Sequence, residues 1–393
     1  MKGFIVFNGN IKLEVDFINK FKERILFSNH IDPKVKDSKK VLLITAAWQK
    51  REFYEGHVKE ALNDIGIESD YSNGFDENIQ NLSVYNDFNE FKRIEPKIYN
   101  LYHSKQETIK NVKSFYREKN LGLILILKKQ LSILRKTFHH TNLHKALSYN
   151  VELNSQKLNL LNELDLLYHY ACQDIQDNMN KLRENDLQMI KVCKEIDEYF
   201  FTKSNVLENP TYKRMKKELE ERILSSNSIF IFGGHVAVLY NRLNFFKLKD
   251  AFIEANRRGT NFYTVSAGSL CLCDNLIISD SVKTYNLELF DIAFGLVKKI
   301  QLFPHCKDYI NMEDSDTITY IAERFNHLMC VGMDQQSFLL LETYEENGQE
   351  YERFVSKGKE EGLYIFDKTG KIITTDYKEE LVLAGTKFYQ NVI

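Results

Sequence analysis

In residues 1–83 and again from residue 201 onward, apolar residues occur in short runs that are separated by amphipathic stretches. The runs that read as buried strands lie at 3–7, 41–46, 228–232 and 261–265. Apolar positions spaced three and four residues apart, which predict helices, lie at 11–26 and 54–65. Strands that alternate with helices in this way predict an α/β fold with a mostly parallel sheet flanked by helices.

The middle of the chain has a different pattern. Residues 123–209 contain neither glycine nor proline and are rich in Leu, Lys, Glu, Gln and Asn. A stretch this long without a helix breaker predicts long helices. Apolar residues form two stripes with mostly helical spacing, Leu153 to Tyr168 and Met189 to Ile196. Two stripes on successive helices predict an inserted antiparallel helical hairpin or small bundle.

These patterns divide the chain into two predicted parts. Residues 1–83 and 201–393 form a discontinuous α/β core, and residues 84–200 form the helical insertion. The segment EGLYIFDKTGKIITTDY at 361–377 predicts a β-hairpin that turns at Asp367–Gly370.

Candidate chemistry lies where three strand-like runs end. In GTNFYTVSAGSLCLC, residues 259–273, an apolar strand runs into Ser266 at a tight strand-to-helix turn. Such a turn exposes the hydroxyl beside a helix N-terminus, where unpaired N–H groups can stabilise an oxyanion. Gly233 and Gly234 follow another strand, and a glycine pair leaves backbone N–H groups unobstructed. His305 follows a third run, and parallel strand ends meet at one edge of a sheet.

Taken in order, these motifs resemble peptidase family S51, which includes dipeptidase E and cyanophycinase and has a class I glutamine amidotransferase-like (flavodoxin-like) fold. The matching positions are Gly233-Gly234-His235, Ser266-Ala267-Gly268, Asp280 and Pro304-His305. The resemblance covers roughly 226–340 and extends weakly over 1–75. It implies a serine hydrolase that cleaves an amide bond in a small peptide, often after an acidic residue.

The resemblance also implies a role for each matching residue. Ser266 would be the nucleophile and His305 its base. The N–H groups of Gly234 and Ala267 would form the oxyanion hole. Asp280 best matches the acidic residue that orients the histidine, with Asp274, Asp291 and Asp334 as open alternatives.

Three positions depart from the family pattern. His235 replaces an asparagine and can be a helix cap, which we favour, or a substrate contact. Gln335 or Gln336 stands where the family usually has a glutamate, and Phe303 stands where cyanophycinase-like members carry an aspartate. These changes affect the charge near the site but leave the nucleophile and the base in place.

Composition narrows the choice of partners. The net charge of −2, from 53 basic and 55 acidic residues, gives no overall field that would attract nucleic acid. The apolar run at 121–127 is far shorter than the roughly 20 residues of a membrane span, and no signal peptide is evident, so we expect a cytoplasmic protein. The six cysteines lack metal-site spacing and predict buried apolar positions, so no metal or other cofactor is expected.

The sequence is therefore compatible with two functions from different classes. The first is the serine peptidase described above. The alternative is a regulatory or interaction protein that uses the helical insertion, with a repurposed or inactive hydrolase core. Leucine-rich stripes on long helices favour a homo-oligomer formed through the insertion, and a separate protein partner is a further possibility.

Overall fold

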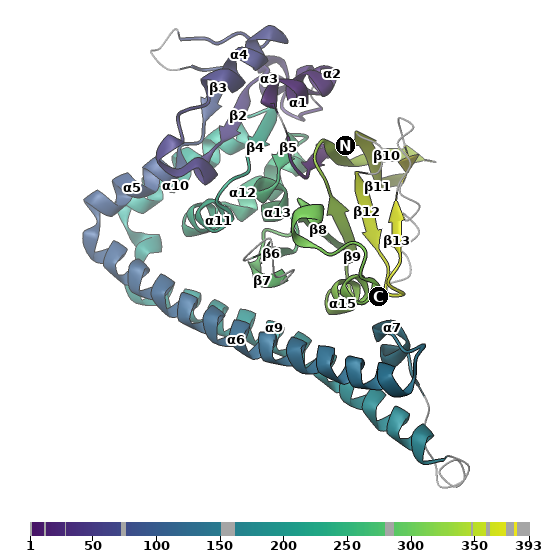
Figure 1. The fold of residues 1–393 in the computed structure, drawn as a ribbon. Helices are drawn as coiled ribbons and strands as arrows, with labels where there is room; N and C mark the ends of the chain where they lie inside the picture. The colour runs from purple at the N-terminus through teal and green to yellow at the C-terminus, as the bar shows by residue number, and fades with distance from the viewer. Residues whose placement is uncertain are drawn as a thin grey trace.

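A computed structural model describes residues 2–11, 13–27, 29–71, 76–150, 162–279, 287–346, 349–358, 362–374 and 381–382. It shows a mixed α/β protein with a large, mainly parallel sheet flanked by helices, as the sequence predicts (Figure 1). The sheet has the order β14-β11-β10-β1-β5-β4-β2-β3. Its parallel strands are β1 (Ile5–Asn8), β5 (Asn261–Val265), β4 (Ser228–Ile231), β2 (Val41–Ile44) and β3 (Ile79–Asn81).

Antiparallel strands extend this sheet at one side. β10 (Ser337–Glu346) pairs with β1, and β11 (Gln349–Gly358) pairs with both β10 and β14 (Leu381–Val382). Helices that precede or connect the parallel strands are α1 (Glu14–Lys20), α2 (Lys22–Leu26), α3 (Pro33–Ser38), α4 (Gly56–Asp64), α10 (Pro210–Leu224), α11 (Val236–Phe245) and α12 (Lys249–Arg257). Both faces of the sheet are covered, so the parallel strands are apolar throughout rather than alternating.

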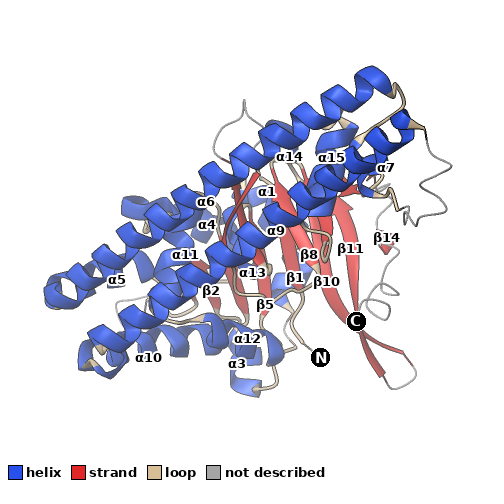
Figure 2. Ribbon diagram, turned by 90° about the horizontal axis from the view of Figure 1, so that it is seen from below, coloured by secondary structure: helices blue, strands red, loops and turns tan. Residues whose placement is uncertain are grey.

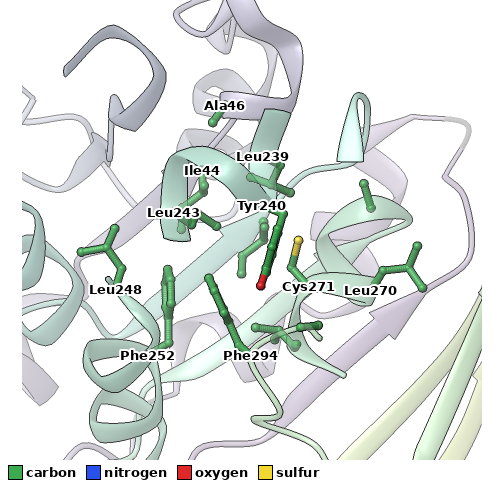
Figure 3. Close-up of a cluster of buried hydrophobic side chains, with 14 of the residues drawn as sticks. Ile44, Ala46, Leu239, Tyr240, Leu243, Leu248, Phe252, Leu270, Cys271 and Phe294 are labelled. Carbon is green, nitrogen blue, oxygen red and sulfur yellow. The ribbon is translucent and has the colours of Figure 1, made fainter. Parts of the chain in front are cut away.

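Strand residues alternate between two hydrophobic clusters. Leu42 and Ile44 of β2 face one cluster, whereas Val41 and Leu43 face the other. Figure 3 shows part of the first cluster, in which Leu239, Leu243 and Tyr240 of α11 lie near Ile44 and Phe294. Packing on both faces fixes the sheet, and with it the positions of the strand ends that carry the candidate site.

A second, four-stranded sheet has the order β13-β12-β9-β8. Its strands are β8 (Ile300–Pro304), β9 (Met329–Met333), β12 (Leu363–Phe366) and β13 (Ile372–Thr374). β12 and β13 form the predicted hairpin, with Gly370 N donating to Asp367 O at 3.0 Å. Elements in the same part of the chain are α13 (Ala267–Leu272), β6 (Asn275–Ser279), β7 (Leu287–Ile292), α14 (Cys306–Tyr309) and α15 (Ser315–Arg324).

Two long helices run side by side along the molecule (Figures 1 and 2). They are α6 (Pro96–Thr137) and α9 (Glu163–Ser204), each of 42 residues and thus about 60 Å long. α5 (Val84–Ile94) precedes the pair, and α7 (Leu143–Leu147) lies near its far end. The helical hairpin is therefore present, while the division of the chain into two domains at 83/84 and 200/201 stays a prediction.

The first predicted apolar stripe is exposed at two of its described positions, while Tyr168 is partly buried against a hydrophobic cluster. Leu164 and Leu167 are 54% and 51% exposed, and residues 151–161 lie outside the described part of the chain. Both stripes also belong to α9 where they are described, so the partner of α9 in the hairpin is α6. The second stripe is confirmed at Met189 and Cys193, which are buried. Spacing alone assigned the two stripes to successive helices, but their described parts both lie on α9, and a 42-residue helix changes its packed face along its length.

Candidate active site

Ser266 follows β5 and is the N-cap of α13, and its backbone is strained. Its φ of 49° and ψ of −110° lie in a region that residues with a side chain rarely adopt. Gly268 explains why a small residue must follow, because a Cβ there would lie 2.1 Å from the backbone oxygen of Ile231 in β4. The tight packing of α13 against β4 holds the turn, and the turn presents the Ser266 side chain to a cleft.

His305 faces Ser266 across this cleft. The Ser266 Oγ and His305 Nε2 atoms are 3.0 Å apart, which is hydrogen-bond distance. His305 follows β8 and has a left-handed backbone, with φ 55° and ψ 36°. The sequence analysis expected it at the edge of the same sheet as Ser266, which is wrong, because β8 belongs to the second sheet. The two side chains meet because the second sheet ends beside the first.

Burial sets the protonation of this histidine. Desolvation lowers the pKa of His305 below its usual value near 6.5, and the charges of Asp308 and Asp334 partly oppose that shift. The imidazole is therefore neutral at neutral pH, which is the state that can accept a proton from a hydroxyl.

The glycine pair lies at the same place, after β4. A Cβ on Gly233 would lie 3.0 Å from the Cβ of Ser266, so the chain passes directly beside the serine. Gly234 has a φ of +132° and is exposed. Ala267 is the first residue of α13, so its N–H has no acceptor within the helix. The structure thus brings Ser266, His305, Gly234 and Ala267 together around one cleft.

The turn after β2 holds the glycine pair from the other side, and the sequence analysis missed it. This turn is the 3₁₀-helix η1 (Ala46–Arg51). The Trp48 indole Nε1 donates to Gly233 O at 3.1 Å, and Ala47 O accepts from His235 N at 3.1 Å. The two bonds flank Gly234 and fix its peptide groups. The single tryptophan of the chain was the available signal.

The acidic partner of His305 is only partly located. Asp280 lies outside the described residues. Of the alternatives, Asp291 pairs with Lys113 at 2.7 Å and Asp274 accepts from the backbone of Lys299, whereas Asp334 acts electrostatically on His305. Asp308 was not anticipated. Its Oδ2 lies 3.8 Å from His305 Nδ1, too far for a hydrogen bond, and its position three residues after the histidine was the only signal.

His235 has a local structural task. It is the N-cap of α11, and its Nδ1 accepts a hydrogen bond from Val238 N at 3.3 Å. This is the capping arrangement that we favoured from the sequence, and it occupies one ring nitrogen. A contact with substrate stays a prediction.

Several other groups are unsuited to the chemistry. Burial raises the pKa of Cys306 to about 12, so this thiol beside His305 stays protonated. All six cysteines are buried and form no disulfide.

Within the described ranges, no group of three or more His, Cys, Asp or Glu side chains is placed to hold a metal ion. Among the same residues, no helix is long and apolar enough to cross a membrane.

This cleft, with a serine on a strained turn facing a neutral imidazole, is typical of hydrolases on α/β folds. The model of peptidase family S51 matches residues 188–346, which confirms the resemblance and supports a peptidase activity. No curated protein matches the chain. Among solved structures, the chain is similar to a peptidase from an acI-B1 Actinobacterium, with 11% identity over 98% of each chain and a TM-score of 0.45.

Proposed function

We propose that this protein is a serine peptidase in which Ser266 is the nucleophile and His305 is the general base. The observation that carries the proposal is the 3.0 Å separation of Ser266 Oγ and His305 Nε2 at a strained turn. The family match over the same region supports it. The substrate class that follows is a small peptide.

In this mechanism His305 takes the hydroxyl proton as the Ser266 oxygen attacks the substrate carbonyl carbon. The N–H groups of Gly234 and Ala267 donate to the oxyanion, a contribution of about 3–4 kcal/mol per donor in known cases. The C–N bond then breaks, and His305 returns its proton to the leaving amine. Water hydrolyses the resulting ester with the same histidine as base.

A fluorophosphonate probe tests this assignment, because it labels only an activated serine. We expect labelling of the wild-type protein, located at Ser266 by mass spectrometry, and none in Ser266→Ala. His305→Ala should lower the labelling rate by at least about 100-fold, the effect of losing a general base. Ser104→Ala and His103→Ala, on the exposed side of α6, are matched controls that should label normally. Wild-type protein that stays unlabelled between about pH 6 and 9 contradicts the proposal.

Self-association through the helical hairpin is a second, separate proposal. Phe115, Ile126 and Ile133 of α6 are 63%, 47% and 63% exposed. They are spaced 11 and 7 residues apart, close to whole helical turns, so they share one side of the helix. Exposed apolar side chains on one side of a long helix are available for contact with a second copy of the chain, and this contact is what we propose.

The oligomeric state tests that proposal. Phe115→Lys with Ile133→Lys should convert an oligomer to a monomer in sedimentation analysis, because two charges would enter the contact. Lys110→Glu, an exposed change on the same helix, is the control. A wild-type protein that is already monomeric at high concentration contradicts it.

A further inference from the structure

The cleft beside Ser266 is walled mainly by apolar side chains. It has a volume of about 550 Å³. Its apolar lining comes from several elements and includes Leu270, Ile277, Ile278, Leu287, Phe303 and Ile310. Among the described lining residues, Glu14 is the one carboxylate, and neither lysine nor arginine is present.

This wall is held firmly in place. Ile277, Leu287, Phe303 and Ile310 belong to one buried cluster, and each is less than a tenth exposed. Arg324 of α15 also donates to Leu287 O at 2.7 Å. A substrate side chain that enters the cleft therefore meets a preformed apolar surface rather than mobile polar groups.

Cationic side chains lie outside the cleft, in a neighbouring groove. Lys50 and Arg51 line that groove, which shares Glu14 and Trp48 with the cleft. Glu14 thus lies where the two join, and its carboxylate is 3.5 Å from His57. The charges of the two regions differ: the groove offers the cations of Lys50 and Arg51 to an anionic group, whereas the charged residue among the described lining of the cleft is Glu14.

We propose that the cleft selects peptides whose acyl residue carries an uncharged, apolar side chain, and that Glu14 disfavours an acidic one. The inference rests on the proposed function, because it needs Ser266 as the attacking group. Burying apolar area is favourable, whereas a carboxylate would lose its hydration without gaining a lysine or arginine from the described lining. Repulsion from Glu14 adds to that cost. This preference differs from the acidic one that the family resemblance implies.

Amino-acid diphenyl phosphonates test the preference without requiring turnover. The Ser266 oxygen bonds to phosphorus, phenoxide leaves, and the hydroxyl proton passes to His305. Leucyl, asparaginyl and aspartyl phosphonates have side chains of similar size. The difference in rate between the leucyl and asparaginyl compounds therefore reports the effect of an apolar side chain, and the difference between the asparaginyl and aspartyl compounds reports the effect of charge. Mass spectrometry gives the rate of Ser266 labelling for each, and a simple fluorophosphonate measures serine activation independently.

We expect leucyl phosphonate to react about tenfold or more faster than asparaginyl, and aspartyl to be the slowest. Glu14→Gln should raise the aspartyl rate about threefold and leave the leucyl rate unchanged, and salt should weaken the effect. Glu184→Gln, which removes an exposed carboxylate from α9, is the matched control.

The possible failures are distinguishable. If the fluorophosphonate labels Ser266 but the aspartyl phosphonate reacts fastest, the selectivity inference is overturned and the proposed peptidase stands. Equal aspartyl rates in wild type and Glu14→Gln overturn the role of Glu14. If the fluorophosphonate fails to label Ser266, both the function and the inference are overturned.

Discussion

Strain at Ser266 gives a prediction that separates stability from chemistry. Ser266→Gly and Ser266→Ala both remove the hydroxyl, but only glycine removes the Cβ that makes φ 49° and ψ −110° unfavourable. Strained backbone of this kind costs about 1–3 kcal/mol. Relief of this strain stabilises the glycine variant, but the greater conformational freedom of glycine in the unfolded chain offsets about 0.5–1 kcal/mol of that stabilisation. From the middle of each range we therefore expect Ser266→Gly to be more stable than Ser266→Ala by about 1 kcal/mol, while both are inactive.

Gln49 provides an internal comparison. Its φ of 59° and ψ of −119° lie in the same region as those of Ser266. Gln49→Gly should therefore exceed Gln49→Ala in stability by a similar amount. Urea unfolding followed by circular dichroism gives the free energy of unfolding of all four variants, and the values are comparable when the four dependences of that free energy on urea concentration have the same slope. Equal stability of the glycine and alanine variants at both positions would refute the reasoning from strain.

Three further predictions concern the surroundings of the nucleophile. Because the pKa of His305 is lowered, fluorophosphonate labelling should continue to below pH 6.5 as the pH falls. Asp308→Asn should move the acid limb of the labelling pH profile lower still, because it removes a charge that raises this pKa. An acid limb above pH 7 in the wild-type protein would contradict this. Trp48→Phe removes the hydrogen bond to Gly233 O, so it should lower the free energy of unfolding measured in urea by about 1 kcal/mol and slow fluorophosphonate labelling. An unchanged labelling rate would exclude a positioning role for Trp48. Gly268→Ala should lower the free energy of unfolding by about 1–3 kcal/mol or more, since the new Cβ would strike the backbone of β4. A variant that unfolds at the same urea concentration as the wild-type protein would contradict the close packing of α13 against β4.

The sequence was most informative about elements whose pattern is local. Short apolar runs located β2, β4 and β5, because strands buried on both faces are apolar at every position. The turn residues at 367–370 located the β12–β13 hairpin. The glycine pair and the small residues after Ser266 marked the tight turns at the ends of strands.

Local sequence patterns do not record how distant segments come into contact, and the resemblance alone implied that Ser266 and His305 act together. The pairing of Ser266 with His305 follows from two sheets that end side by side, which no local pattern records. The bond from Trp48 to Gly233 joins residues 185 positions apart. The exposure of Leu164 and Leu167 was not predicted, because the partner of α9, α6, decides which side of the helix is covered.

The chain by itself therefore determined its α/β class, its long helices and the candidate residues for the chemistry, because those depend on local spacing and residue type. Only the tertiary structure decided which of these residues meet, which charges lie beside them and how far His305 is desolvated. These properties depend on packing between segments far apart in sequence, where burial and distance set both pKa and reactivity.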